Sequence, residues 1–225
     1  MQGHNLSGFM QQTDMQGMHL SGKSWTDLEL PLFSENANEV NLLDGSGWTL
    51  SFTFRTDSNV DSSDVVACIG KYDENQNLLA GIEIQAGKVL YAVQTAQYSS
   101  NITKGDLVTI DIVGQRYVGP GDTEANPNHW FIKTYVNGVL SMITSHTSNQ
   151  IFNTDNSGAY GWYFNDYLHI GGRVIDGEIY DACSVHVYDF KGYSTALSDN
   201  EIIQNYISST IYSQLGPNDN PDMST

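Results

Sequence analysis

The stretch AYGWYFNDY, residues 159–167, holds the densest group of side chains suited to binding a ligand. Aromatic faces stack on sugar rings, while amides and carboxylates bond the surrounding hydroxyl groups. The residues that could form such a carbohydrate-binding platform are Tyr160, Trp162, Tyr163, Asn165 and Asp166. The alternative is that Trp162 and Phe164 fill a hydrophobic core while the tyrosines cover an edge. Both interpretations stay open at the level of sequence.

Three runs of alternating oxygen-bearing residues could hold a hard cation such as Ca²⁺. They are Asp57-Asn59-Asp61, Asp73-Asn75-Asn77 and Asn153-Asp155-Ser157. None completes an EF-hand loop, because Ser62 and Cys68 stand where Gly and Glu are required after Asp57. Asx-rich turns produce the same pattern without a metal. We take Asp57, Asn59 and Asp61 as candidate ligands, although the pattern does not choose among the runs.

Catalytic constellations are not evident, so we expect no enzyme. Cleavage of a glycosidic bond needs two carboxylates that flank it, and Glu178 and Asp181 are the nearest pair. Three residues apart on a strand, they point to opposite faces. Glu83 stands alone, and the six histidines lie far apart without zinc-like spacing.

Composition narrows the class of partner. The chain has 225 residues, 26 acidic and nine basic, and a formal charge of −17. Such a surface repels phosphate backbones, which argues against nucleic-acid binding. No apolar run is long enough to span a bilayer, and no basic segment precedes an apolar one as in a signal peptide. Cys68 and Cys183 lie in apolar runs and are expected as small core residues, with a disulfide between them left open.

Short runs of alternating apolar and polar residues begin near residue 48. In WTLSFTFRT, one face of a strand would carry Trp48, Leu50, Phe52 and Phe54. Asn137-Gly138 joins two such runs and predicts a type I′ hairpin, because both central residues need positive φ. About ten runs, with turn residues between them and no helical period before residue 198, predict an all-β antiparallel sandwich.

The segment ALSDNEIIQNY, residues 196–206, departs from this alternation. Ser198 and Glu201 have the spacing of a capping box, in which each side chain bonds the other residue's backbone N–H. An apolar stripe follows at helical spacing, formed by Ile202, Ile203, Tyr206 and Ile207. The segment predicts one short C-terminal helix whose stripe belongs to the core.

Three parts of the chain can be distinguished. Residues 1–24 are expected to form a flexible arm, in which MQGHNLSG at 1–8 returns as MQGMHLSG at 15–22. This repeat is either an accident of a biased tail or a peptide offered twice to equivalent sites on a partner. Residues 25–213 are expected to form a single sandwich domain, and 214–225 a flexible tail.

The order of several segments resembles laminin G-like, concanavalin A-like β-sandwich domains. These segments are GWTLSFTFRTD (47–57), KTYVNGVL (133–140), LHIGG (168–172) and GEIYDACSVHVYDFKGYSTALSDNEIIQNY (177–206). The stretch between Tyr188 and Ala196 is longer than the family pattern. The ending also resembles such modules in structural proteins of tailed phages. The resemblance implies a jelly-roll sandwich with a helix packed against one edge or end.

The same resemblance implies a non-catalytic module of a phage tail or capsid appendage, located on the virion. Its expected partners are a bacterial surface glycan or other virion proteins, without membrane insertion and with a homo-oligomer left open. Family members often hold one calcium ion, which keeps Ca²⁺ as a candidate cofactor. The alternatives are a purely structural virion protein without a ligand, and a secreted bacterial adhesin or carbohydrate-binding module.

Overall fold

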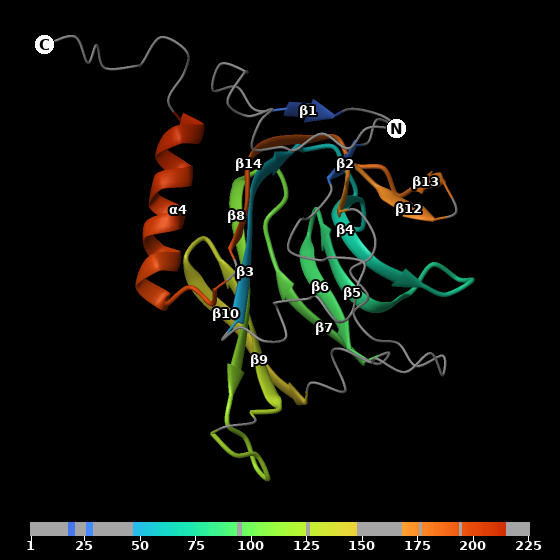
Figure 1. Cartoon of the computed structure of the whole chain (residues 1–225). Helices are drawn as coiled ribbons and strands as arrows, with labels where there is room; N and C mark the ends of the chain where they lie inside the picture. The colour runs from blue at the N-terminus through green and yellow to red at the C-terminus, as the bar shows by residue number, and fades with distance from the viewer. Residues whose placement is uncertain are drawn as a thin grey trace, which may run out of the picture.

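The computed structural model describes residues 18–20, 26–28, 47–93, 96–124, 127–147, 168–175, 177–193 and 195–214. In these residues, two six-stranded antiparallel sheets pack face to face, and a two-stranded hairpin lies beside them (Figure 1). Sheet A has the order β1-β14-β3-β8-β9-β10, and sheet B has the order β2-β11-β4-β5-β6-β7. The predicted antiparallel β-sandwich is therefore confirmed.

Most strands are six or more residues long, and the short ones lie at or near one end of each sheet. Sheet A comprises β1 (Met18–Leu20), β3 (Gly47–Thr56), β8 (Leu107–Tyr117), β9 (His129–Val136), β10 (Val139–Thr147) and β14 (Val185–Tyr193). Sheet B comprises β2 (Thr26–Leu28), β4 (Val65–Tyr72), β5 (Leu78–Gln85), β6 (Lys88–Val93), β7 (Ala96–Asn101) and β11 (Leu168–Ile170). The hairpin comprises β12 (Arg173–Ile175) and β13 (Glu178–Tyr180). One described helix, α4 (Asp199–Gln214), follows β14.

The core lies between the two sheets. Its largest fully buried side chains include Trp48 and Phe54 of sheet A and Tyr91 of sheet B. These belong to strands whose alternate residues point inward, as the period-two pattern predicts. Asn137 and Gly138 both have positive φ, 53° and 76°, which confirms the hairpin expected between β9 and β10.

The N-terminal segment supplies an edge strand to each sheet. β1 pairs with β14 of sheet A, and β2 pairs with β11 of sheet B. Residues 18–20 thus differ from the expectation of a flexible arm over 1–24, because their backbone groups are paired in a ladder and Leu20 is buried. The first copy of the repeat and residues 215–225 of the expected tail lie outside the described residues, whereas Gln214, the first residue of that tail, is the last residue of α4.

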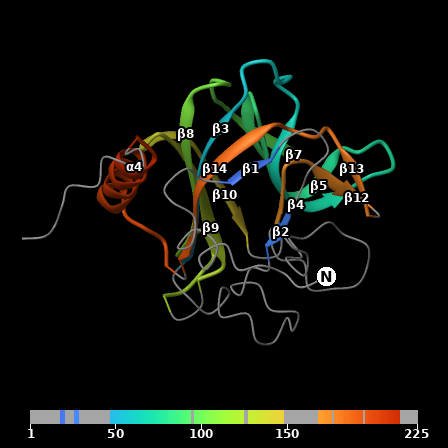
Figure 2. The same cartoon turned by 90° about the horizontal axis from the view of Figure 1, so that it is seen from above.

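Helix α4 packs on the outer face of sheet A, outside the sandwich (Figure 2). Ile202 is fully buried, but Ile203 and Ile207 are 43 % and 49 % exposed, so the predicted apolar stripe is wrong at these two positions. Asn205 and Ser209 are buried in their place. The reason is that the outer face of sheet A is polar where the helix packs, so polar helix residues face it.

One amide connects the helix to that face. Asn205 Nδ2 donates to Ser51 Oγ at 2.7 Å and to Asp111 Oδ1 at 2.9 Å. Asn205 Oδ1 accepts from Lys191 Nζ at 3.1 Å and from Tyr193 OH at 3.2 Å. All four hydrogen-bonding positions of the amide are therefore used.

The start of α4 has the contacts of a capping box. The backbone N–H of Ser198 donates to Glu201 Oε2 at 2.7 Å, and that of Glu201 donates to Ser198 Oγ at 3.4 Å. These bonds satisfy two backbone donors. The Ser198 hydroxyl also donates to Glu201 Oε2 at 2.7 Å, and this bond, followed by the one from the Ser198 N–H, holds the pKa of Glu201 below its usual value. None of the described helices is long and apolar enough to cross a membrane.

Candidate ligand-binding cleft

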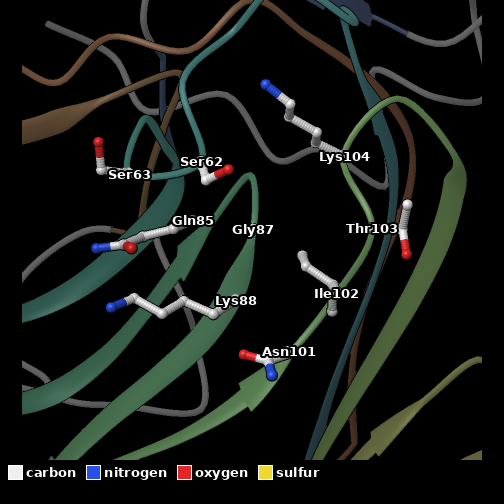
Figure 3. A pocket seen from close by; sticks show the side chains of 9 residues that line it. All are labelled: Ser62, Ser63, Gln85, Gly87, Lys88, Asn101, Ile102, Thr103 and Lys104. Carbon is white, nitrogen blue, oxygen red and sulfur yellow. The ribbon is translucent and has the colours of Figure 1, made fainter.

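A polar cleft of about 540 Å³ opens where three connections of the sandwich meet (Figure 3). The connections are those between β3 and β4, between β5 and β6, and between β7 and β8. The lining residues are Ser62, Ser63, Gln85, Gly87, Lys88, Asn101, Ile102, Thr103 and Lys104. Seven of these nine carry a polar side chain, so the cleft is suited to a ligand rich in hydroxyl or charged groups.

Backbone hydrogen bonds fix the three connections to one another. The N–H of Gly87 donates to Ser62 O at 2.9 Å, and the N–H of Ile102 donates to Gly87 O at 3.0 Å. A side chain at position 87 would place its Cβ 2.7 Å from Ser62 Cβ, which is too close for real atoms. Gly87 therefore allows the close approach on which the shape of the cleft depends.

Two ammonium groups give the cleft a charge opposite to that of the whole chain. Lys88 and Lys104 are two of only nine basic residues in a chain of net charge −17. Lys104 Nζ donates to Val60 O at 2.7 Å, a contact that uses one of its three donors and positions the ammonium. The Lys88 side chain has no hydrogen bond or ion pair to any described residue. An anionic group on a ligand would find both cations here.

Gln85 links the cleft to a buried polar network. Its Nε2 donates to Glu83 Oε1 at 2.6 Å, and both side chains are buried. Arg173 holds the same carboxylate with two bonds, from Nε at 3.0 Å and Nη2 at 3.1 Å. The Tyr72 hydroxyl donates to Glu83 Oε2 at 2.8 Å. The side chain of Gln85 is thus held by a rigid support behind the cleft wall.

Arg173 comes from β12, which the two-stranded hairpin brings next to sheet B. Its Nη1 donates to Asp181 Oδ2 at 2.7 Å, and its guanidinium lies over the Tyr72 ring at 5.0 Å. Burial alone would lower the pKa of Arg173, but the bonds and charge of Glu83 raise it above the ordinary value. Both carboxylates therefore serve to hold an arginine, which is a structural role.

The other end of the Gln85 amide is buried without a partner among the described residues. Gln85 is 6 % exposed, and its Oε1 has no hydrogen-bond partner among the described residues. A buried carbonyl oxygen without a partner loses its hydration and gains nothing in exchange. The Asn101 amide and the Ser62, Ser63 and Thr103 hydroxyls give the cleft both acceptors and donors.

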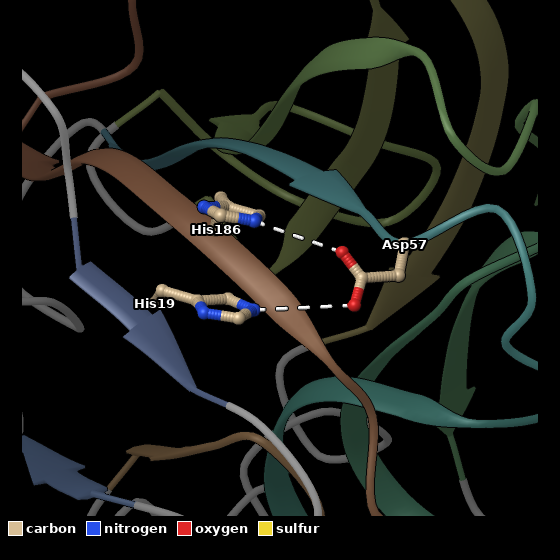
Figure 4. Close-up of side chains that lie close together, drawn as sticks. All are labelled: His19, Asp57 and His186. Atoms are coloured by element: carbon tan, nitrogen blue, oxygen red, sulfur yellow. Dashed lines mark ion pairs between the residues drawn. The ribbon is translucent and has the colours of Figure 1, made fainter.

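A second group of chemically active side chains lies on the sheet A side of the molecule. His19 of β1, His186 of β14 and Asp57 after β3 place their ligand atoms within 4.8 Å of one another (Figure 4). The Nε2 atoms of His19 and His186 lie 3.9 Å and 3.6 Å from different carboxylate oxygens of Asp57. Two imidazoles and a carboxylate are a donor set for a transition metal, unlike the all-oxygen sites that Ca²⁺ prefers.

The structure describes some of the predicted site residues and not others. Tyr160, Trp162, Tyr163, Asn165 and Asp166 lie outside the described residues, so the aromatic platform stays a prediction. Asp57 faces two histidines, whereas Asn59 and Asp61 are exposed in the following turn. Calcium binding by these three residues also stays a prediction.

The structure also shows the second oxygen run, Asp73-Asn75-Asn77, and the two cysteines. In the second oxygen run, Asp73 Oδ1 accepts from the backbone N–H groups of Asn75 and Asn77, both at 2.8 Å, which is an Asx turn between β4 and β5. Cys68 and Cys183 are buried free thiols, as expected of core residues. Burial raises the pKa of Cys68 to about 11, which makes that thiol unreactive.

Sequence reasoning missed the cleft and the histidine pair. The cleft residues come from positions near 62, 87 and 103, and no short motif contains them. His19 and His186 are 167 positions apart, and only the β1–β14 pairing makes them neighbours. One signal was present: two of the few lysines, Lys88 and Lys104, flank strand-like runs that end in turn residues.

Comparison with solved structures supports the fold. The carbohydrate-binding module CBM40 of the Ruminococcus gnavus IT-sialidase, solved with α2,3-sialyllactose, is 15 % identical with a TM-score of 0.52, and the match covers 85 % of this chain and 96 % of that one. A structure described as HCR/D-Sa-GBL1/C is 14 % identical with a TM-score of 0.51, and the match covers 85 % of this chain and 42 % of that one.

A botulinum neurotoxin type C structure, whose description reports interaction with two ganglioside molecules, has a TM-score of 0.48 at 13 % identity. Its match covers 85 % of this chain and 42 % of that one. No protein-family description matches this sequence, and no curated protein sequence matches it. At such identities the likeness shows the β-sandwich fold alone.

Proposed function

We propose that this protein is a non-catalytic glycan-binding module, and that the cleft between Ser62 and Lys104 binds a sugar bearing a carboxylate or sulfate group. The observation that carries the proposal is the polar cleft with two lysines in a strongly acidic chain. Ammonium groups bind such anions, and the amides and hydroxyls around them match the hydroxyls of a sugar. The fold shared with a carbohydrate-binding module solved with an acidic oligosaccharide supports it.

The experiment is a glycan array on the full chain, followed by calorimetric titration with α2,3-sialyllactose and with lactose. This pair differs only in the acidic sugar, so it isolates the contribution of that sugar. We expect the array hits to be enriched in acidic glycans. The alternative of a purely structural protein predicts no hit, and that result would remove the proposal.

Charge-removing variants assign the binding to the cleft. We expect Lys88→Gln and Lys104→Gln each to weaken binding of the acidic hit by about tenfold or more, because a hydrogen bond to a charged group contributes about 1.5–3 kcal/mol. Lys133→Gln is the matched control, since Lys133 lies on β9 and bonds Gln115. Equal affinities of all three variants would place the site elsewhere on the chain.

From the sequence resemblance, we also propose that this glycan-binding module is part of a virion. A module of this kind on a phage tail or capsid appendage would attach the virion to a bacterial surface glycan. The cleft supports glycan binding, and the location on the virion stays a prediction. Detection of the chain by mass spectrometry in purified virions, rather than in culture supernatant, would decide between the virion and a secreted adhesin.

A further inference from the structure

We propose that His19, Asp57 and His186 bind a divalent transition-metal ion, with Zn²⁺ as the probe of choice. The site is separate from the glycan cleft in its residues and chemistry, and the proposal does not depend on glycan binding. It rests on the convergence of three ligating side chains from three adjacent strands or their ends, β1, β14 and β3. Figure 4 shows both imidazoles directed at the same carboxylate.

The distances match those between ligands of a metal. Zinc lies about 2.0–2.2 Å from nitrogen and oxygen ligands, so two ligands of a tetrahedral site are about 3.4 Å apart. The Nε2 atoms here lie 3.6 Å and 3.9 Å from the Asp57 oxygens. These separations are too long for hydrogen bonds. The three ligand atoms therefore lie near the spacing of ligands around one ion, and the stacked imidazoles would turn about their Cβ–Cγ bonds to face it.

The two imidazole rings are stacked on each other. Their centroids are 3.9 Å apart and their planes differ by 9°, and His19 is the direct register partner of His186. Two protonated imidazoles at this separation would repel each other, and Arg55, opposite His186 on β3, adds positive charge. Neutral imidazole is the form that binds a metal.

The chemical class of the ion follows from the donor atoms. Two nitrogens and one carboxylate oxygen favour zinc and its neighbours over calcium or magnesium, which prefer all-oxygen sites. Three protein ligands leave a fourth position for water or for another molecule. The side chains of His19, Asp57 and His186 are between 35 % and 44 % exposed, so an ion can reach them from solvent.

A bound ion would also have a structural effect. β1 has three residues and joins the sheet through three register pairs, of which His19 is the middle one. Such a short edge strand gains little stability from its own pairing. A metal held by His19 and His186 would connect this strand to β14 and to the end of β3. The ion would thereby stabilise the attachment of the N-terminal segment to sheet A.

The test is calorimetric titration of the metal-free full chain with Zn²⁺, repeated with His186→Gln and His19→Gln. We expect one ion per chain, and more than about tenfold weaker binding in each variant, because removal even of an outer partner of a metal ligand weakens binding 10–100-fold. His129→Gln is the matched control, because His129 contacts a single carboxylate, Asp122, and no second histidine is part of that pair. It should bind zinc as the unaltered chain does.

Two additional readouts make the result independent of small affinity differences. Cobalt should give the intense visible absorption of a tetrahedral site in the unaltered chain and not in His186→Gln. Zinc at about 100 times its dissociation constant should raise the melting temperature of the unaltered chain by about 5–10 °C. Unchanged zinc affinity in both histidine variants, or the absence of any saturable binding by the unaltered chain, would overturn the proposal.

Discussion

At Glu83, four donors from three different side chains meet one carboxylate that is 1 % exposed. An isolated charge in such a position is strongly disfavoured, and the arginine opposite makes it tolerable. The same carboxylate holds Gln85 at the cleft wall. The residue is therefore important both for stability and for the shape of the candidate site.

We expect Glu83→Gln to lower the free energy of unfolding by about 3 kcal/mol, because removing one partner of a buried ion pair leaves the other uncompensated. Asp181 keeps one contact with Arg173 and limits the loss. Urea unfolding followed by Trp fluorescence measures the change. A loss under about 1 kcal/mol would mean that water reaches the Glu83–Arg173 ion pair in solution.

The matched comparison removes both charges at once. The double variant Glu83→Leu with Arg173→Met replaces the pair by apolar groups, which is often close to neutral for buried ion pairs. We expect it to be more stable than Glu83→Gln. The reverse order would show that the geometry of the network, and not its uncompensated charge, determines stability.

At the scale of the element, the docking of α4 depends on Asn205 more than on its exposed apolar residues. Asn205→Ala should lower the free energy of unfolding by about 2 kcal/mol, since it removes one donor from the fully buried Asp111. Ile203→Ser and Ile207→Ser should each change it by about 0.5 kcal/mol or less, because surface substitutions rarely do more. Chemical denaturation of the three variants compares them, and a larger loss for either isoleucine would restore the apolar-stripe interpretation.

The connection between β8 and β9 is organised by one carboxylate. Asp122 Oδ2 accepts from the N–H groups of Gly119 and Asn128 at 2.9 Å and 2.8 Å, and from His129 Nδ1 at 2.7 Å. Burial by itself would raise the pKa of Asp122, but the bonds from Asn128, His129 and Gly119 lower it to about 2. The lowered pKa means that the folded state favours the charged form.

The pH dependence of this connection follows from that shift. A carboxyl group with a folded pKa below its unfolded value of 3.8 contributes stability above pH 4 and loses it as the pH falls to about 2. We expect the Asp122 carboxyl carbon to titrate in NMR with a midpoint near 2. The amide signals of Gly119 and Asn128 should move with the same midpoint. A midpoint near 3.8 would show that the bonds do not persist in solution.

The strands were predictable from sequence to the extent that alternation and turn residues determine them. β3 and the Asn137-Gly138 hairpin are examples, since both signals are local. The buried face of α4 was not predictable in the same way. Which helix residues face inward depends on the sheet beneath them, and Ser51 and Asp111 of that sheet are far away in the sequence.

The candidate sites were less accessible to sequence reasoning for a similar reason. Lys88 and Lys104 line the same cleft only after β5, β6 and β7 have paired. No single segment of the sequence determines the register of that pairing. Asp57 was identified as a candidate ligand from its oxygen-rich neighbours. Its partners in the structure are instead two histidines from distant strands.

At the scale of the molecule, the charge of −17 should oppose the compact state through self-repulsion. We expect the melting temperature at pH 7 to rise when NaCl increases from about 20 mM to about 500 mM, because salt screens exposed charges over shorter distances. Near pH 4.3, the sequence pI, the same addition should have little effect. Calorimetry at both pH values tests this, and an equal response at both would point to a general salt effect.

The placement of β1 and β2 has a consequence for aggregation. Each strand covers the outer hydrogen-bonding edge of one sheet, β1 over β14 and β2 over β11. A chain shortened to begin after residue 28 would expose two rows of unpaired backbone groups, which are the surfaces on which foreign strands add to a sheet. Another copy could then donate its own N-terminal segment, as in domain-swapped assemblies. With the N-terminal segment in place, these two edges are instead formed by three-residue strands, and very short edge strands are poor templates for such pairing.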